Sequence, residues 1–192
     1  MQSHPRLVVL DRDGTLNLDD KAIIAGPDDW VPVPDALEAV ARLNQAGWRV
    51  VIATNQSGLG RGLFDADTMN RVHAKMNKLL AAVGARVDAV FCCPHTRDDA
   101  CDCRKPKPGL ILKIAERFGV PVDEIAVAGN TVRHIQAGHA AGAHTHLLLT
   151  GKCAAYSLNE PPPGLPAGAH IHASLDEFVT HLLGGGLTTT TS

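Results

Sequence analysis

Two carboxylates, Asp11 and Asp13, follow the apolar run Leu7 to Leu10 and stand one residue apart. Charged groups at the end of a buried strand are costly unless something uses them. One carboxylate of such a pair can attack phosphorus and hold a cation, while the other passes protons to the leaving oxygen. The alternative is a surface turn that begins at Gly14, and the pair by itself does not decide between the two.

Polar residues also follow the next three predicted strands. They are Thr54, Asn55, Gln56, Ser57 and Gly58 after the second strand, a Cys/His cluster with Arg104 and Lys105 after the third, and Gly129 and Asn130 after the fourth. Ligands of open parallel sheets bind beyond the carboxyl ends of the strands, so we expect these loops to converge on one crevice. There Thr54 can donate hydrogen bonds to phosphate oxygens, and Lys105 can neutralise the charge that spreads over them during transfer. This convergence favours a phosphate-handling site over a surface turn.

The elements that must position these residues alternate between strand-like and helix-like segments. Strand patterns cover 7–10, 48–55, 87–91, 124–129 and 144–150, and helix patterns cover 34–47, 65–84, 109–119, 132–142 and 174–184. Asp65 is a predicted N-cap, and Ser174 and Glu177 have the spacing of a capping box. The alternation predicts an α/β fold with a parallel sheet and crossover helices.

Length and composition limit the classes of protein to consider. With 192 residues, 45% of them hydrophobic, we expect one domain over 1–184 and a flexible tail over 185–192. The net charge of −2 predicts no particular partner. No stretch resembles the basic stripe of a nucleic-acid binder, and 4% aromatic residues leave few rings for base stacking. The first strand begins too early for a signal peptide and no run of about 18 apolar residues occurs, so we expect a cytoplasmic protein without a membrane partner. In that compartment the five cysteines are thiols or metal ligands rather than disulfides.

Three motifs resemble a known family. "LDRDGTLN", "ATNQSGLGRG" and "CRKPKPG" are similar to the first three motifs of the haloacid dehalogenase phosphatase superfamily. With the Cys/His cluster between them, their order more narrowly resembles the heptose bisphosphate phosphatases, with histidinol-phosphate phosphatases as close relatives. The resemblance runs from about Leu7 to Lys152, which is most of the chain.

The resemblance implies a Rossmann-like parallel sheet with helices on both faces, a minimal cap and a zinc-stapled loop. It implies that Asp11 forms an aspartyl-phosphate, that Asp13 is general acid and then base, and that Mg2+ is held by Asp11 and the Asp13 carbonyl. Thr54 and Lys105 would be phosphate ligands and Arg104 a substrate contact. The implied reaction is hydrolysis of the 7-phosphate of D-glycero-D-manno-heptose 1,7-bisphosphate, a small phosphorylated sugar, by an enzyme that we expect to be a monomer.

The cluster "CCPHTRDDACDC" can be tested on spacing. Cys93 with His95 and Cys101 with Cys103 form two close pairs that a five-residue loop allows to face each other, as tetrahedral Zn2+ requires. The alternative is a polar loop with four reduced residues, and the resemblance, which places structural zinc here, favours the metal. Cys92 is left over and is expected to be a buried thiol. A zinc staple would aim the two basic residues that directly follow the last ligand.

The fourth predicted strand departs from the superfamily pattern. That pattern has Gly-Asp and a second Asp four residues later, whereas this chain has Asn130 and His134 at the two positions. The Asn130 amide oxygen can ligate Mg2+ but brings no negative charge, so we expect weaker Mg2+ binding. His134 could ligate a softer ion or make an ordinary hydrogen bond, and we favour the hydrogen bond. Three hypotheses stay open: the heptose bisphosphatase, a histidinol-phosphate or other sugar phosphatase, and an impaired homologue that only binds a phosphorylated ligand.

Several other residues have two interpretations. Asn55, Gln56, Ser57 and Arg61 are candidate substrate contacts on the loop after the second strand, although "GLGRG" lacks the ending of a P-loop. Lys107 is assigned to the surface, and Lys152 could equally reach the crevice or be exposed. The histidines His134, His139, His144 and His146 resemble a metal-binding tract, but a solvated or hydrogen-bonded set is the preferred interpretation.

Overall fold

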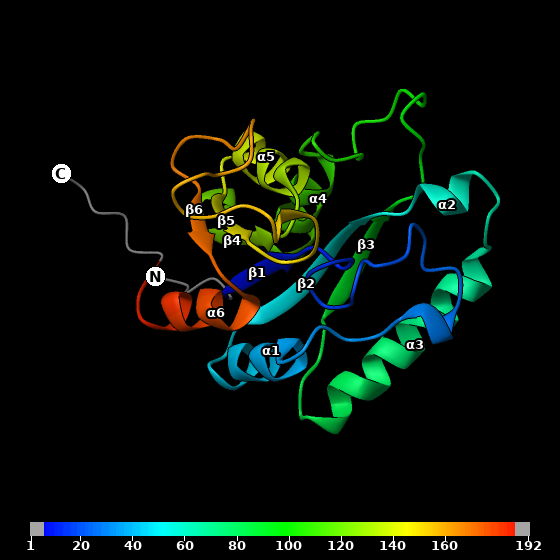
Figure 1. Cartoon of the computed structure of the whole chain (residues 1–192), viewed down its shortest axis with the longest axis horizontal. Coiled ribbons are helices and arrows are strands. Elements are labelled where there is room, and N and C mark those ends of the chain that lie inside the picture. The colour runs from blue at the N-terminus through cyan, green and yellow to red at the C-terminus, as the bar shows by residue number, and fades with distance from the viewer. Residues whose placement is uncertain (1–5, 187–192) are drawn as a thin grey trace.

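The computed structural model describes residues 6–186 and contains one six-stranded sheet, shown in Figure 1. The strands are β1 (Leu7–Leu10), β2 (Arg49–Asn55), β3 (Ala89–Cys93), β4 (Ile125–Gly129), β5 (His144–Leu148) and β6 (His170–His172). Their order is β3-β2-β1-β4-β5-β6, and every neighbouring pair is parallel. The predicted α/β fold with a parallel sheet is therefore confirmed.

Helices cover both faces of this sheet. They are α1 (Ala36–Gln45), α2 (Ser57–Gly60), α3 (Ala66–Ala82), α4 (Gly109–Phe118), α5 (Val132–Ala141) and α6 (Leu175–Leu183), with 3-10 turns η1 (Pro27–Asp29), η2 (Val122–Glu124) and η3 (Gly151–Cys153). In Figure 1, α1, α3 and α6 lie on one side of the strands and α4 and α5 on the other. Among residues 6–186, none of the helices has both the length and the apolar character needed to cross a bilayer.

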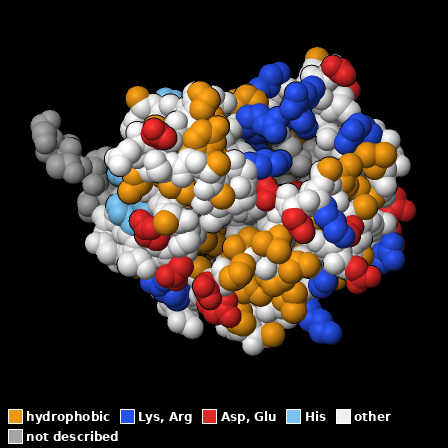
Figure 2. All heavy atoms as spheres, viewed as in Figure 1, with side chains coloured by type: hydrophobic (Ala, Val, Ile, Leu, Met, Phe, Trp, Pro, Cys, Tyr) orange, Lys and Arg blue, Asp and Glu red, His pale blue; other side chains and the backbone are white. Residues whose placement is uncertain are grey.

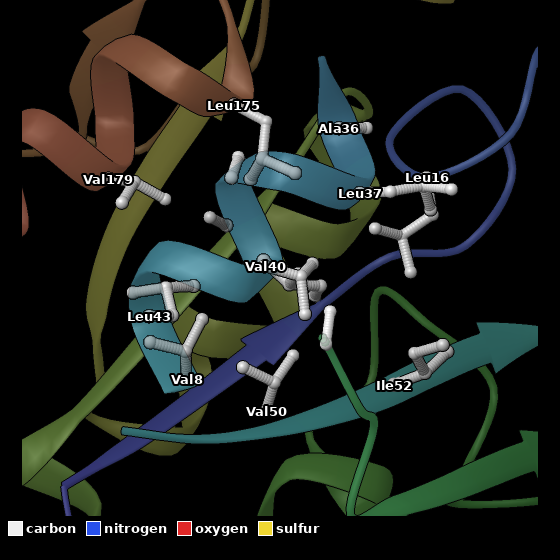
Figure 3. Packing of buried hydrophobic residues seen from close by; sticks show 14 of the residues in the cluster. Val8, Leu16, Ala36, Leu37, Val40, Leu43, Val50, Ile52, Leu175 and Val179 are labelled. Carbon is white, nitrogen blue, oxygen red and sulfur yellow. The ribbon is translucent and has the colours of Figure 1, made fainter. Parts of the chain in front are cut away.

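The side-chain alternation of β1 explains the two layers. All four of its residues are fully buried; Val8 and Leu10 belong to the core cluster shared with α1, α3 and α6, and Leu7 and Val9 to the cluster shared with α4 and α5. Figure 3 shows Val8 pointing toward Leu43 of α1. Successive strand residues point to opposite faces, so a central strand covered on both sides has to be apolar throughout.

The helix starts agree with the predicted caps. The Asp65 carboxylate accepts a hydrogen bond from the Thr68 amide at 2.8 Å, and the Ser174 hydroxyl accepts one from the Glu177 amide at 3.1 Å. The Glu177 carboxylate accepts from the amide of Ala173, one residue before the cap, at 3.0 Å. Side-chain acceptors thus satisfy N–H groups that the first helical turn leaves free.

The end of the chain differs from the sequence-based expectation. The strand β6 was not predicted, because three residues that include two histidines carry no apolar alternation. Of the predicted flexible tail over 185–192, Gly185 and Gly186 donate hydrogen bonds to the carbonyls of Leu182 and His181. The remaining residues, 187–192, lie outside the described part of the chain.

The strand order also determines where a ligand site can form. The chain moves from β1 to β2 on one side and continues with β4 on the other, so the order reverses at β1. Ligands of such sheets bind beyond the carboxyl ends of the strands at this switch point. The chain between β1 and α1 contains only η1 as a regular element, which leaves this end of the sheet without a separate cap domain.

Candidate active site

A buried ion pair lies at the end of β1. The Lys105 Nζ is 2.9 Å from Asp11 Oδ1 and donates a hydrogen bond to the Ala53 carbonyl at 2.7 Å. Burial alone would raise the pKa of Asp11, but the Lys105 ammonium and the Arg12 amide outweigh it, so the pKa lies below its usual value. Asp11 is therefore an ionised carboxylate near neutral pH, as a nucleophile or a cation ligand must be.

His134, at the start of α5, belongs to the same group of contacts. Its Nδ1 lies 2.9 Å from Lys105 Nζ and 3.9 Å from Asp11 Oδ2. Burial, with the nearby ammonium, lowers the pKa of His134 to about 3, so the ring is neutral and Nδ1 accepts from Lys105. The preferred sequence interpretation, a hydrogen-bonded histidine, agrees with this geometry. Its hydrogen-bond partner is Lys105 of the third motif, and the sequence alone could not predict that the two residues pair.

Asp13 lies further out than Asp11 and is held by several donors. Its side chain is 33% exposed. Arg12 Nε and Asn17 Nδ2 donate to Oδ1 at 2.9 and 3.1 Å, and Gln56 Nε2 donates to Oδ2 at 3.1 Å. Gln56 Nε2 also donates to Thr54 Oγ1 at 2.9 Å. The two predicted residues Gln56 and Thr54 are thus linked to the outer carboxylate, which contacts both protein and solvent.

Arg12 is a site residue that the sequence interpretation did not assign. Its side chain is almost completely buried, and its Nη1 lies 3.2 Å from Nε2 of His73 on α3. Burial and the guanidinium lower the pKa of His73 to about 4, so the neutral ring accepts this hydrogen bond. The available signal was the basic residue between the two carboxylates, since a charged side chain next to a buried strand requires partners.

A cavity of about 80 Å3 opens onto these groups. Its lining residues are Asp11, Asp13, Thr54, Asn55, Lys105, Thr131, Arg133 and Lys152. The first five of these residues were predicted from the sequence, and Thr131 and Arg133 were missed. For Lys152 the sequence left two alternatives open, and the structure places it in the crevice. Ser57 begins α2 and the exposed Arg61 follows its end; neither lines this cavity.

A larger, basic cavity of about 490 Å3 adjoins the first and shares Lys105 and Arg133 with it. Its lining residues are Arg97, Asp99, Cys101, Arg104, Lys105, Pro106, Lys107 and Arg133. In Figure 2, Lys and Arg side chains gather around a hollow at the upper rim of the molecule. Burial and the neighbouring Arg97 and Arg104 lower the pKa of Arg133. Lys107, assigned to the surface, is exposed but also lines this cavity.

Asn130 is fully buried where β4 ends. Its Oδ1 accepts from the Thr15 hydroxyl at 3.2 Å, and its Nδ2 lies 3.4 Å from Asp19 Oδ2. Gly14 has φ +81°, and a Cβ there would lie 1.9 Å from Asn130 Nδ2, so only glycine fits. Carboxylate and amide oxygens are donor types that suit Mg2+. Asn130 lines a cavity beside that of Asp11, and the two cavities share Thr131, Arg133 and Lys152.

The four predicted zinc ligands lie together. One ligand atom from each of Cys93, His95, Cys101 and Cys103 lies within 4.8 Å of the others. The Sγ of Cys93 is 3.5 Å from His95 Nδ1 and 3.9 Å from Cys101 Sγ, and His95 Nδ1 is 3.2 Å from Cys103 Sγ. Tetrahedral Zn2+ with these ligands separates them by about 3.5–3.8 Å, so the donor set fits the ion. Cys92 is separate and only half-buried, with its Sγ 3.9 Å from Met69 Sδ.

The loop with these ligands also positions a basic residue. The Arg104 Nη1 donates to the His95 carbonyl at 2.8 Å. The Asn55 side chain makes two hydrogen bonds to the backbone of Lys105. Its Nδ2 donates to the Lys105 carbonyl and its Oδ1 accepts from the Lys105 amide, both at 3.2 Å. These contacts join the Cys/His loop to the end of β2 and direct Lys105 toward Asp11.

Comparison with known proteins identifies the family of this chain. The family model for haloacid dehalogenase-like hydrolases matches residues 16–142, well over half of the chain. The D-glycero-beta-D-manno-heptose-1,7-bisphosphate 7-phosphatase of Bordetella bronchiseptica is 45% identical over 178 residues, which cover 93% of this chain and 98% of the relative. The enzyme of the same name from Pseudomonas aeruginosa is 42% identical over 92% of this chain and 97% of its own length.

Two solved structures are similar to this chain over most of its length. The crystal structure of D,D-heptose 1,7-bisphosphate phosphatase from B. bronchiseptica, in complex with magnesium and phosphate, has a TM-score of 0.88 and 44% identity over 94% of this chain and 99% of that one. The Burkholderia thailandensis structure of the same name has a TM-score of 0.71 and 45% identity, and covers 93% of this chain and 98% of its own.

Proposed function

The chain belongs to the haloacid dehalogenase-like hydrolase family and is a phosphatase, and we propose that it removes the 7-phosphate of D-glycero-D-manno-heptose 1,7-bisphosphate. The observation that carries this proposal is the pair of joined cavities, one with the carboxylates and one with four cationic side chains besides Lys105. A substrate with two phosphate groups can place one in each. The names of the similar enzymes support the same substrate.

The reaction starts at Asp11. Its ionised carboxylate attacks the phosphorus atom, so that an Asp11–phosphorus bond forms while the bond to the sugar 7-oxygen breaks. Asp13, which is the more exposed carboxylate, takes up a proton from solvent and passes it to that oxygen. It then takes a proton from the water molecule that attacks phosphorus and releases Asp11. Lys105 and Thr54 contact the non-bridging oxygens and balance their charge.

Mg2+ would be held by the Asp11 carboxylate, the backbone carbonyl of Asp13 and the amide oxygen of Asn130. When bound, it supplies positive charge that draws the phosphate toward the nucleophile and stabilises the equatorial oxygens. With Asn130 in place of Asp, this ligand set has one negative charge less than the superfamily pattern. The carboxylate of Asp19 lies next to the Asn130 side chain. The ion should therefore bind, but less tightly than with Asp at this position.

The basic cavity favours a bisphosphate over histidinol phosphate. Burial, and after it the repulsion from the charges of Arg97 and Arg104, lower the pKa of Arg133. A second phosphate relieves this repulsion and can pair with guanidinium groups in bidentate geometry. A protonated amine would increase the repulsion, so histidinol phosphate should be the poorer substrate.

The test is phosphate release from heptose 1,7-bisphosphate, heptose 7-phosphate and histidinol phosphate at saturating Mg2+. We expect the highest kcat/KM for the bisphosphate. Arg133→Gln should lower it about 10-fold to 100-fold, and the value for the monophosphate by less, while the control Arg71→Gln on the exposed face of α3 changes neither. A preference for histidinol phosphate would contradict the proposal.

The alternative of an impaired, ligand-binding homologue is supported by the neutral residues Asn130 and His134. It predicts that phosphate binds at the crevice, by calorimetry, while none of the three substrates is turned over at any Mg2+ concentration. Turnover that recovers when more Mg2+ is added would exclude it.

A further inference from the structure

Three histidines from the last part of the chain meet at the edge of the sheet, away from the crevice residues. One ring nitrogen from each of His146 on β5, His172 on β6 and His181 on α6 lies within 4.8 Å of the other two. The Nδ1 of His146 is 3.0 Å from His172 Nε2. The ring of His170 lies close by, with its centroid 5.1 Å from that of His146. We call His146, His172 and His181 the histidine cluster.

The histidines between His134 and His146 do not form one metal site. His134 belongs to the crevice and His139 is exposed, which agrees with the preference for a solvated or hydrogen-bonded set over a metal-binding tract. His146 instead joins two histidines that come 26 and 35 residues later. Such a cluster has no local spacing, because its members approach one another only when β6 and α6 pack against β5.

The histidine cluster contains unsatisfied polar atoms. The side chain of His146 is fully buried and that of His172 is 4% exposed. Nevertheless, the Nε2 atoms of His146 and His181 have no hydrogen-bond partner among residues 6–186. Buried polar groups are nearly always paired, and an unpaired one indicates a missing water, ion or ligand.

The electrostatic surroundings favour neutral imidazoles. Burial and the neighbouring rings lower the pKa of His146 to about 2 and that of His172 to about 4. Glu177 acts on His172 in the opposite direction without reversing the shift. Neutral imidazoles keep a lone pair, and three of them facing one another form a donor set that suits zinc, copper or nickel rather than magnesium.

We propose that the histidine cluster is a second transition-metal site, which holds a divalent ion such as Zn2+ through His146, His172 and His181. The site is separate from the Cys/His loop and from the crevice, and its fourth position is open to water or to His170. Bound there, the ion links β5, β6 and α6, and so fixes the three-residue edge strand and the C-terminal helix. A hydrogen-bonded stack of imidazoles is the competing explanation, and it predicts no bound ion.

The first measurement is metal content of the full chain without an affinity tag. After removal of metals and reloading with Zn2+ in excess Mg2+, which occupies the crevice, we expect two zinc ions per chain in the parent and one in His181→Gln. His139→Gln, which changes an exposed histidine outside the cluster, is the control and should retain two. A parent that holds a single ion, lost when Cys103 is replaced by Ser, would overturn the proposal.

Co2+ loading then distinguishes the two sites. In Cys103→Ser, where the thiolate site is weakened, the remaining Co2+ should show d–d absorption of a nitrogen-ligated ion without thiolate charge-transfer bands. The Tm of the parent should rise on addition of Zn2+ and rise less in His181→Gln. His170→Gln, a second and more exposed variant, should bind the ion still if His170 is not a required ligand. Equal metal content and equal Tm shifts in the parent and His181→Gln would exclude the site even if His181→Gln folds poorly by itself.

Discussion

The two sides of the crevice differ in charge. On the side of β1 and β2, Asp11, Asp13 and Arg12 are charged and paired at 2.9 Å with their partners. On the side of β4, Asn130 and His134 are neutral where the superfamily pattern has Asp. The comparison indicates that the two carboxylates proposed as nucleophile and acid-base partner are present and paired, whereas the β4 side has less negative charge than the superfamily pattern.

Lys105 connects the two sides. It is buried, with Asp11 as its charged partner and the neutral His134 as an acceptor. A second carboxylate at position 134 would compete for the charge of this lysine, whereas here Asp11 is its partner at ion-pair distance and Asp13 acts on it from further away. The crevice therefore keeps Asp11 ionised and suits anionic substrates, and we expect weaker Mg2+ binding in return.

The largest expected effect comes from the charged side. Asp11→Asn should lower phosphate release by at least about 1000-fold, because the nucleophile is lost. It also leaves the buried Lys105 without a counter-charge, which costs about 3–5 kcal/mol of stability. Activity and the Tm should both be measured, with Asp123→Asn at an exposed position of η2 as the control. Near-normal turnover in Asp11→Asn would remove it from the mechanism.

His134, on the neutral β4 side of the crevice, should make the free energy of unfolding decrease at acid pH. The pKa of His134 is about 3 in the folded state and about 6.5 when unfolded. Its contribution to stability is therefore complete above pH 6.5 and is lost as the pH falls toward 3, by roughly 2 kcal/mol at pH 5. Urea unfolding at pH 7 and pH 5 should show this loss in the parent.

His134→Asn is the matched variant, since its amide oxygen can still accept from Lys105. The loss of stability between pH 7 and pH 5 should be smaller in this variant, while the buried His146 and His172 keep part of it in both proteins. The same pH dependence in parent and variant would mean that His134 is not the titrating group.

A negative charge restored on the β4 side tests whether this side of the crevice limits Mg2+ affinity. Asn130→Asp should lower the Mg2+ concentration for half-maximal activity about tenfold, because it returns a carboxylate to the ligand set. Asn70→Asp adds the same charge on the exposed face of α3 and should have no effect. If Asn130→Asp leaves the Mg2+ dependence unchanged, the amide is not at the ion.

The smallest expected effect concerns Asp19. Its Oδ2 lies 3.4 Å from Asn130 Nδ2, so its charge acts on the ion from further away. Asp19→Asn should weaken Mg2+ binding about twofold to threefold, measured by calorimetry as well as activity. Asp20→Asn, at the exposed neighbouring position, is the control, and equal affinities in the two variants would show that Asp19 contributes nothing specific.

The sequence by itself determined the features that local spacing encodes. The apolar run 7–10 predicts a strand that is buried on both faces, and β1 is one. One cavity is lined by the two carboxylates that follow β1 and by Thr54, Asn55 and Lys105. These residues meet because parallel strands end at the same edge of the sheet. The four candidate zinc ligands lie together because two close pairs require only a short loop to meet, and the family resemblance favoured them over a polar loop.

Only the tertiary structure decided which distant residues act together. Arg133 and Lys107 line the same basic cavity, His134 pairs with Lys105, and His146 meets His181. None of these pairs has a fixed spacing along the chain, since each depends on how a helix or edge strand packs on the sheet. Periodicity reports which face of an element is buried, but the partner of a buried polar side chain depends on the neighbouring element. That is why the sequence located the reacting carboxylates, while the charge balance around them and the histidine cluster came from the fold.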